Sequence, residues 1–120
     1  MYPYWWNDTI TLYRRKENKN DSGKTIITWE RERLQGCFWS TTHRQALSNT
    51  ELTYQSTFII RIPAAQCEPI NKGDIAIKGD VEDKIVSVSE ILNKYSESFV
   101  INTAKDNSRL PESHYYGSDA

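Results

Sequence analysis

Few residues in this sequence have side chains suited to catalysis or metal binding, and those few stand apart in the chain. They are Cys37, Cys67, His43 and His114. No CxxC pair occurs, and no cysteine and histidine have the spacing of a metal site. No motif places a serine, a cysteine or a carboxylate beside either histidine, so general acid–base catalysis is not expected. We therefore predict no enzyme activity, no metal, no cofactor, and two buried or half-buried free thiols.

Charged residues form one acidic and one basic cluster. Asp80-Val81-Glu82-Asp83 holds three carboxylates in four residues. Calcium loops need alternating oxygen ligands and a turn glycine, and this run lacks that order, so it is interpreted as a solvated acidic turn or a surface for a basic partner. The 15 basic and 16 acidic residues give a formal net charge of −1, which argues against a dedicated DNA-coating protein. Channel contacts with DNA are a hypothesis for Arg14, Arg15, Lys16 and Arg44.

Aromatic residues make up 12% of the chain, whereas hydrophobic residues reach only 38%. Such a surplus of Trp and Tyr is typical of interfaces. Residues 1–7 form an aromatic arm, which either folds back against its own domain or docks on a neighbouring subunit. The ERER run at 30–33 is too charged to be buried on both faces, so it suits a sheet edge or a projecting ribbon. The interface candidates in these two segments are Tyr2, Tyr4, Trp5, Trp6, Arg31 and Arg33.

The elements that must position these residues are strands, because apolar and polar residues alternate along most of the chain. In Ser56–Gly79, one strand carries Phe58, Ile60 and Ile62 on a single face and ends at Pro63. A Lys-Gly-Asp turn then leads into a second strand. We predict that this strand, crossing and strand form the centre of the domain. Further strands are predicted at 8–14, 25–40, 99–103 and 110–116.

Two polar stretches are predicted to protrude from the sheet as loops. Arg15–Lys24 is charged and closes with Asp-Ser-Gly, as the tip of a hairpin does. Thr41–Gln55 has no clean period and little apolar content. We expect an extended loop there, with at most one helical turn at 44–47.

One helix is predicted, over Val88–Tyr95, where it would close one end of a barrel. Ser87-x-x-Glu90 matches a capping box, and apolar residues follow at helical spacing. Residues 117–120 are expected to form a free tail. The chain 1–120 is thus predicted to be a single, mainly β domain, a small barrel or sandwich of about six strands with protruding loops and arms.

Several segments, in this order, resemble one family of phage proteins: DTITLYRR, GKTIITWERERLQGCFW, FIIRIP, KGDIAIKG with VEDKI, and AKDNSRLP. The resemblance runs from Asp8 to Pro111, and it is to small proteins encoded in the head and tail assembly cluster of tailed phages and prophages of Gram-positive bacteria. The shared motifs are structural rather than catalytic. Where the family ends in a tryptophan and a basic residue, this chain has His114-Tyr115-Tyr116, so the resemblance does not define the pairing of the last strand.

The resemblance implies a head–tail connector of the adaptor or stopper type. Such proteins are β-barrels with protruding loops or arms that assemble as rings of six or twelve. The expected protein is a structural virion component of the neck, with the portal or an adaptor above it, tail proteins below it and viral DNA in its channel. A tail terminator or another tail component is the close alternative. A monomeric module that binds a peptide, a glycan or a single-stranded nucleic acid is the more distant one.

Nothing in the sequence predicts a membrane partner. No apolar run reaches the roughly 20 residues of a membrane span, and MYPYWWND lacks the basic start and apolar core of a signal peptide. Synthesis in the cytoplasm of the bacterial host is the expectation that follows.

Overall fold

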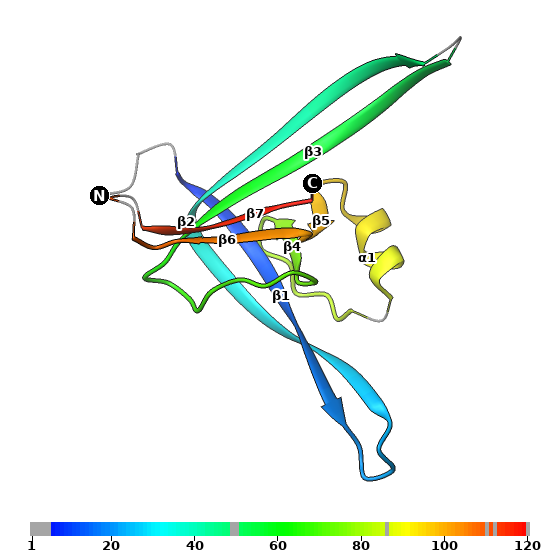
Figure 1. Ribbon diagram of the computed structural model, residues 1–120, viewed down its shortest axis with the longest axis vertical. Coiled ribbons are helices and arrows are strands. Elements are labelled where there is room, and N and C mark those ends of the chain that lie inside the picture. The colour runs from blue at the N-terminus through cyan, green and yellow to red at the C-terminus, as the bar shows by residue number, and fades with distance from the viewer. Residues whose placement is uncertain (1–5, 49–50, 86, 110, 112, 120) are drawn as a thin grey trace.

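The computed structural model describes residues 6–48, 51–85, 87–109, 111 and 113–119, with the backbone alone for 43–48 and 51–56. A curled antiparallel sheet forms a half-barrel and carries one short helix (Figure 1). This confirms the mainly β fold expected from the alternation of residue types. The elements are β1 (Asp8–Lys19), β2 (Thr25–Ser48), β3 (Glu51–Pro63), β4 (Ile75–Lys78), α1 (Val88–Lys94), β5 (Ser98–Val100), β6 (Thr103–Asn107) and β7 (His114–Ser118).

The central strand of the sheet is β2, in the strand order β5-β4-β1-β2-β3-β7-β6. Its first half pairs with β1, as in Tyr13↔Arg31, and its second half pairs with β3 from Phe38 onward. The change of partner occurs around Gly36, whose φ of 66° is a left-handed conformation that glycine adopts without strain. One strand can therefore serve two hairpins.

The predicted central pair is wrong, because β3 and β4 are separated in the sheet by β1 and β2. The strand β4 pairs instead with β1, from Ile10↔Lys78 to Tyr13↔Ile75, and with β5 on its other side. Its residues Ile75, Ala76 and Ile77 are fully buried, so both faces of β4 need cover. Ala76 is covered by the main core on one face, and Ile75 and Ile77 are covered by a second cluster on the other.

The main core lies inside the curl of the sheet. Ile60 and Ile62 of β3 are fully buried there, as the alternation predicted. Phe58 of β3 stacks on Phe99 of β5, with ring centroids 5.3 Å apart, although three strands separate β3 from β5 in the sheet order. This contact across the sheet requires the curl.

A second cluster covers the opposite face of β1 and β4. Tyr13 of β1 packs there with Val81 and with Ile91 of α1. The predicted helix is confirmed at Val88–Lys94, but the capping box is not, because the Ser87 side chain makes no capping hydrogen bond. The helix is held by its buried face, as expected for an element of only two turns. None of the described helical residues form a segment long and apolar enough to cross a membrane.

Two hairpins project from the body and diverge from each other, one towards the top and one towards the bottom of Figure 1. The stretch 41–55, predicted as a loop, belongs to the paired strands β2 and β3 in register up to Ser48↔Glu51. Similarly, β1 continues to Lys19, so only 20–24 form the first turn. Hydrogen bonds between adjacent backbones make these stretches strands, although their polar side chains predicted loops. The radius of gyration, 16.0 Å, exceeds the ~13.6 Å typical of a compact domain of this length.

The C-terminal stretch is also more ordered than predicted. Gly117 and Ser118 belong to β7 and are buried, which contradicts a free tail at 117–120 for its described part. A Cβ atom at Gly117 would lie 3.0 Å from side-chain atoms of Ile60 and Ile70, so a larger residue would fit only if these side chains shifted. The predicted strand at 99–103 is likewise divided between β5 and β6.

Candidate interaction surface

The β1–β2 ribbon, defined here as residues 14–30, extends beyond the rest of the sheet. Its strands remain paired to Lys19↔Thr25, whereas β4 pairs with β1 only as far as Tyr13. The ladder ends where the backbone N–H of Arg15 donates to the buried carboxylate of Asp74, at 3.0 Å. From there the ribbon reaches about 17 Å further as two strands with open outer edges.

The tip of the ribbon is built by Asn20. Its side-chain oxygen accepts the backbone N–H groups of Ser22 and Lys24 at 3.0 and 2.9 Å, and its carbonyl accepts that of Gly23 at 2.9 Å. Gly23 adopts φ 78°, which closes the turn. The tip is therefore a hydrogen-bonded structure with a defined shape.

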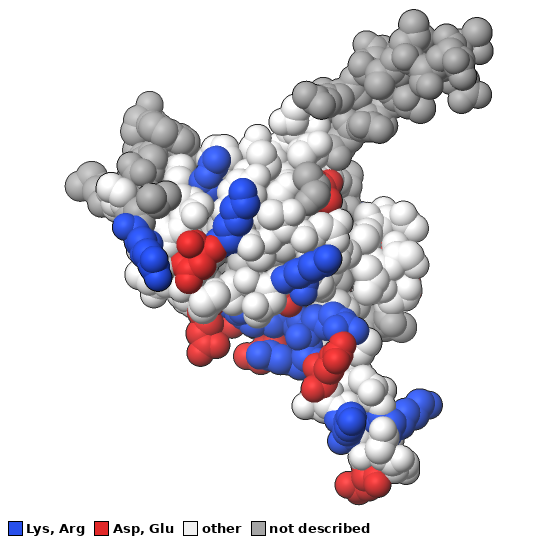
Figure 2. Space-filling model, viewed as in Figure 1, with Lys and Arg blue, Asp and Glu red and all other residues white. Residues whose placement is uncertain are grey.

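Most charges along the two strands of the ribbon are paired within the chain. Glu32 pairs with Arg14 at 3.0 Å and Glu30 with Lys16 at 4.0 Å, while Arg15 pairs with Glu17. Blue and red side chains accordingly alternate along the ribbon in Figure 2. Among these polar side chains the ribbon also exposes two apolar ones, because Ile26 and Ile27 are 42% and 45% exposed.

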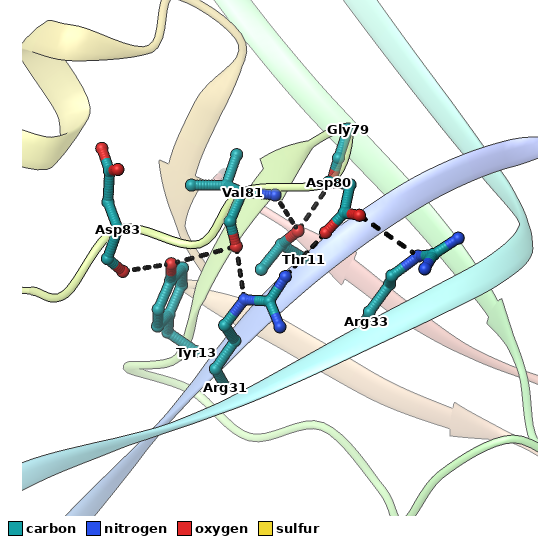
Figure 3. A network of polar contacts seen from close by, with 8 residues as sticks. All are labelled: Thr11, Tyr13, Arg31, Arg33, Gly79, Asp80, Val81 and Asp83. Carbon is teal, nitrogen blue, oxygen red and sulfur yellow. Dashed lines mark hydrogen bonds and ion pairs between the residues drawn. The ribbon is translucent and has the colours of Figure 1, made fainter.

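A polar network clamps residues 79–83 against the base of the ribbon (Figure 3). The Thr11 hydroxyl donates to the Gly79 carbonyl at 2.7 Å and accepts the Val81 N–H at 2.9 Å. The Tyr13 hydroxyl donates to the Asp83 carbonyl at 2.5 Å. Burial is the main reason that the pKa of Tyr13 is raised, so this hydroxyl stays protonated as the donor.

Asp80 is the counter-ion of both arginines in the ERER run. Its carboxylate lies 2.6 Å from Arg31 Nη2 and 3.6 Å from Arg33 Nε, and Arg31 also donates to the Val81 carbonyl. The interface candidates Arg31 and Arg33 are thus exposed to solvent, but both are already paired with Asp80. Their role in this chain is to hold the acidic turn.

The other end of the acidic turn is tied to α1. The Asp83 carboxylate accepts hydrogen bonds from Lys94 Nζ at 2.6 Å and from the Tyr95 hydroxyl at 2.8 Å. These bonds lower the pKa of Asp83, and the same carboxylate raises the pKa of Lys94. The acidic turn is therefore a set of structural counter-ions. Within the described residues, no group of His, Cys, Asp and Glu side chains could hold a metal ion.

A groove of about 490 Å³ runs between the ribbon and residues 82–85. Ile27, Trp29 and Ile85 give it apolar walls, and Glu82 and Lys84 line it with opposite charges. Together with the uncovered isoleucines, the groove makes the ribbon a surface on which another protein can bury apolar area.

A model of the family of unknown function DUF6751 matches residues 5–116. The chain belongs to this family. None of the curated proteins searched matches the chain. The matched range includes the residues of both hairpins.

The aromatic arm of this DUF6751 member is described only in part. Tyr2, Tyr4 and Trp5 lie outside the described residues. The Trp6 ring lies 5.4 Å from the ring of His114 and 6.3 Å from that of Phe38, measured between centroids. At this position, the arm packs against its own domain.

The four basic residues named for DNA contacts lie in different environments in the structure. Arg14 is 5% exposed, and besides Glu32 it donates to the carbonyls of Glu68 and Pro69 at 2.8 and 2.9 Å. Because these contacts within the chain occupy its buried guanidinium, Arg14 is not available to contact DNA. Arg15 and Lys16 are exposed on the ribbon beside carboxylates. For Arg44 only the backbone is described, opposite Gln55.

The two cysteines are free, with Cys37 buried and Cys67 half-buried, as predicted. Burial raises the pKa of the Cys37 thiol to about 12, so it stays protonated and unreactive at neutral pH. His114 is buried beside the Trp6 ring, and for His43 only the backbone is described, opposite Ser56.

Proposed function

We propose that this DUF6751 member is a structural virion protein of the phage neck. In this role it forms a ring at the head–tail junction, connects the portal or an adaptor to the tail and helps to retain DNA. The single observation that supports the proposal is the pair of long hairpins, which diverge from a small body (Figure 1).

A monomer gains little from such hairpins. A two-stranded ribbon is marginally stable alone in water, and an exposed strand edge invites pairing with another chain. A ring subunit, in contrast, must contact two neighbours and two axial partners, and projecting ribbons supply contacts beyond the body. The exposed Ile26 and Ile27 and the groove beside Trp29 favour burial against such a partner.

The internal pairing of the ribbon's charges also suits packing of identical copies. Side chains such as Lys16, Glu30 and Arg31 already have partners in the chain, so bringing copies together does not oppose like charges. The near-neutral net charge of −1 has the same effect.

The test is electron microscopy of particles from a phage or lysogen that carries a stop codon in this gene, complemented by plasmid-borne variants. Without complementation, we expect separate tails and DNA-filled or leaking heads. Normally joined virions would overturn the proposal in favour of a binding module. Joined particles with tails of irregular length would overturn the neck assignment in favour of a tail terminator.

A shortened ribbon sharpens the test. Replacing residues 17–27 by Asn-Gly joins the directly paired Lys16 and Thr28 through a two-residue turn, which leaves the body intact. We expect this variant to fold and to leave heads and tails separate. The control Lys78→Gln changes an exposed residue of β4 and should restore joined virions. Full complementation by the shortened variant would show that the ribbon is not the connecting element.

A further inference from the structure

The sheet face that points away from the main core carries a row of side chains from four neighbouring strands. Lys105, Tyr116, Arg61 and Phe38 are directly opposite one another on β6, β7, β3 and β2. Directly paired residues point to the same side of a sheet, and the next residue along a strand points to the other. Since Ile60 lies in the core, this cation–aromatic row faces outward.

Cations and rings alternate along the row. The Arg61 Cζ atom lies 4.9 Å from the ring centroid of Phe38 and 5.8 Å from that of Tyr116. Lys105 Nζ lies 5.5 Å from the Tyr116 centroid. Trp6 adds a further ring beside Phe38. The guanidinium of Arg61 is therefore held between two rings, which limits its rotamers before any ligand arrives.

The two cations of the row are not neutralised by the part of the chain that the structure describes. Neither Arg61 nor Lys105 forms an ion pair with a described carboxylate, whereas Arg14, Arg31 and Lys94 all do. Figure 2 shows basic side chains on the surface over β6 and β7, with an acidic side chain beside them. This face thus combines uncompensated positive charge with partly exposed rings.

We propose that the cation–aromatic row binds single-stranded nucleic acid. Bases stack on aromatic rings and on arginine planes, and lysine and arginine contact the phosphates, as on other flat sheet surfaces that bind single strands. An acidic peptide would use Arg61 and Lys105 but would make no use of the exposed parts of the Phe38 and Tyr116 rings. A duplex keeps its bases stacked inside and cannot use the rings. The inference does not depend on the neck assignment.

The test is fluorescence anisotropy of the full chain with a labelled oligothymidylate of about 12 nucleotides. We expect Phe38→Ala and Tyr116→Ala each to weaken binding roughly 5- to 100-fold, because each removes a stacking surface. Arg61→Gln should weaken binding and reduce the slope of log affinity against log salt by about 0.7, the value for one phosphate contact with a single strand. Tyr116→Phe, which keeps the ring, should bind like the wild type.

The matched control is Arg15→Gln, which removes one positive charge from the ribbon and should leave affinity and salt slope unchanged. Thermal unfolding by circular dichroism accompanies every variant, and Phe38→Leu replaces Phe38→Ala if the latter does not fold. Three results would overturn the proposal: no binding of the single strand, equal affinity for a duplex of the same length, or equal losses in Arg15→Gln and Arg61→Gln. Binding of polyglutamate that depends on Arg61 but not on Phe38 would overturn it in favour of an acidic peptide.

Discussion

The β1–β2 ribbon and the cation–aromatic row use the same residue types in opposite ways. On the ribbon and its base, Arg14, Arg15, Arg31 and Arg33 each face a carboxylate. On the row, Arg61 faces two rings instead. A carboxylate uses both the charge and the N–H donors of a guanidinium, whereas a ring contacts its face and leaves the donors at its edge free.

The comparison shows that a run of charges in a sequence does not mark a free binding surface. The conspicuous ERER run is internally satisfied, and the isolated Arg61 in FIIRIP is not. Exposed ion pairs contribute only about 0–1 kcal/mol each, so the ribbon's charges serve solubility and register more than stability. Four experiments test this difference between charges that hold the structure together and charges that are free for a partner.

The largest effect is expected at two adjacent residues of β3 that point to opposite faces. Ile60→Asp places a carboxylate in a fully buried site, which should cost several kcal/mol of the roughly 5–15 kcal/mol of folding free energy and abolish cooperative unfolding. Arg61→Ala should change stability by about 1 kcal/mol or less. Thermal melts followed by circular dichroism compare the two. Equal loss of folding would mean that the outer face is part of the core.

The next effect separates two neighbouring arginines. Arg14→Gln leaves the carboxylate of Glu32 and the carbonyls of Glu68 and Pro69 without their donor, and should destabilise the protein by about 2–4 kcal/mol. Arg15→Gln loses only an exposed pair with Glu17, and should stay within about 0.5 kcal/mol of the wild type. Urea unfolding measures both. Similar values would show that the buried guanidinium is not a structural centre.

A smaller effect is expected from the counter-ion of the ERER run. Asp80→Asn weakens the partner of both Arg31 and Arg33, and should lower the free energy of unfolding by about 1 kcal/mol at low salt and by less at high salt. A double-mutant cycle with Arg31→Gln should give a coupling of about 0.2–1 kcal/mol. A coupling of zero at low salt would show that the paired charges are independent of each other.

The smallest effect is the pH dependence of the tie between the acidic turn and α1. Because the pKa of Asp83 is lowered, its contribution is present at neutral pH and is lost as the pH falls through that lowered value, below the ordinary 3.8. Because the pKa of Lys94 is raised, the contribution is also lost as the pH rises above that raised value, beyond the ordinary 10.5. The stability difference between the wild type and Asp83→Asn, measured by urea unfolding across pH, should therefore shrink at both extremes. A difference that is constant with pH would contradict this tie.

Local elements followed from the sequence with few errors. Alternation placed Ile60 and Ile62 in the core, and helical spacing placed Ile91 on the buried face of α1. The error at 41–55 has a physical reason, since a polar stretch becomes a strand when its backbone pairs with the adjacent segment, whatever its side chains.

The candidate surfaces were much less predictable. Only Glu30 of the ERER run lies on the ribbon, whereas residues 31–33 lie at its base, where β1 is their strand partner. The counter-ion Asp80 lies 49 residues beyond Arg31 in the chain. In the sequence Arg14 has no evident partner, but in the structure its guanidinium donates to the carbonyls of Glu68 and Pro69. The cation–aromatic row could not be found at all, because its four residues come from four separate strands.

The sequence by itself determined the helix and the centres of most strands, because side-chain alternation and glycine or proline conformations act over a few residues. The tertiary structure alone decided which strands are neighbours, and hence that β4 pairs with β1 and not with β3. Strand order depends on which apolar faces can be buried together across the whole chain. The same long-range pairing brings Arg61 between Phe38 and Tyr116, and so decides which charges are left for a partner.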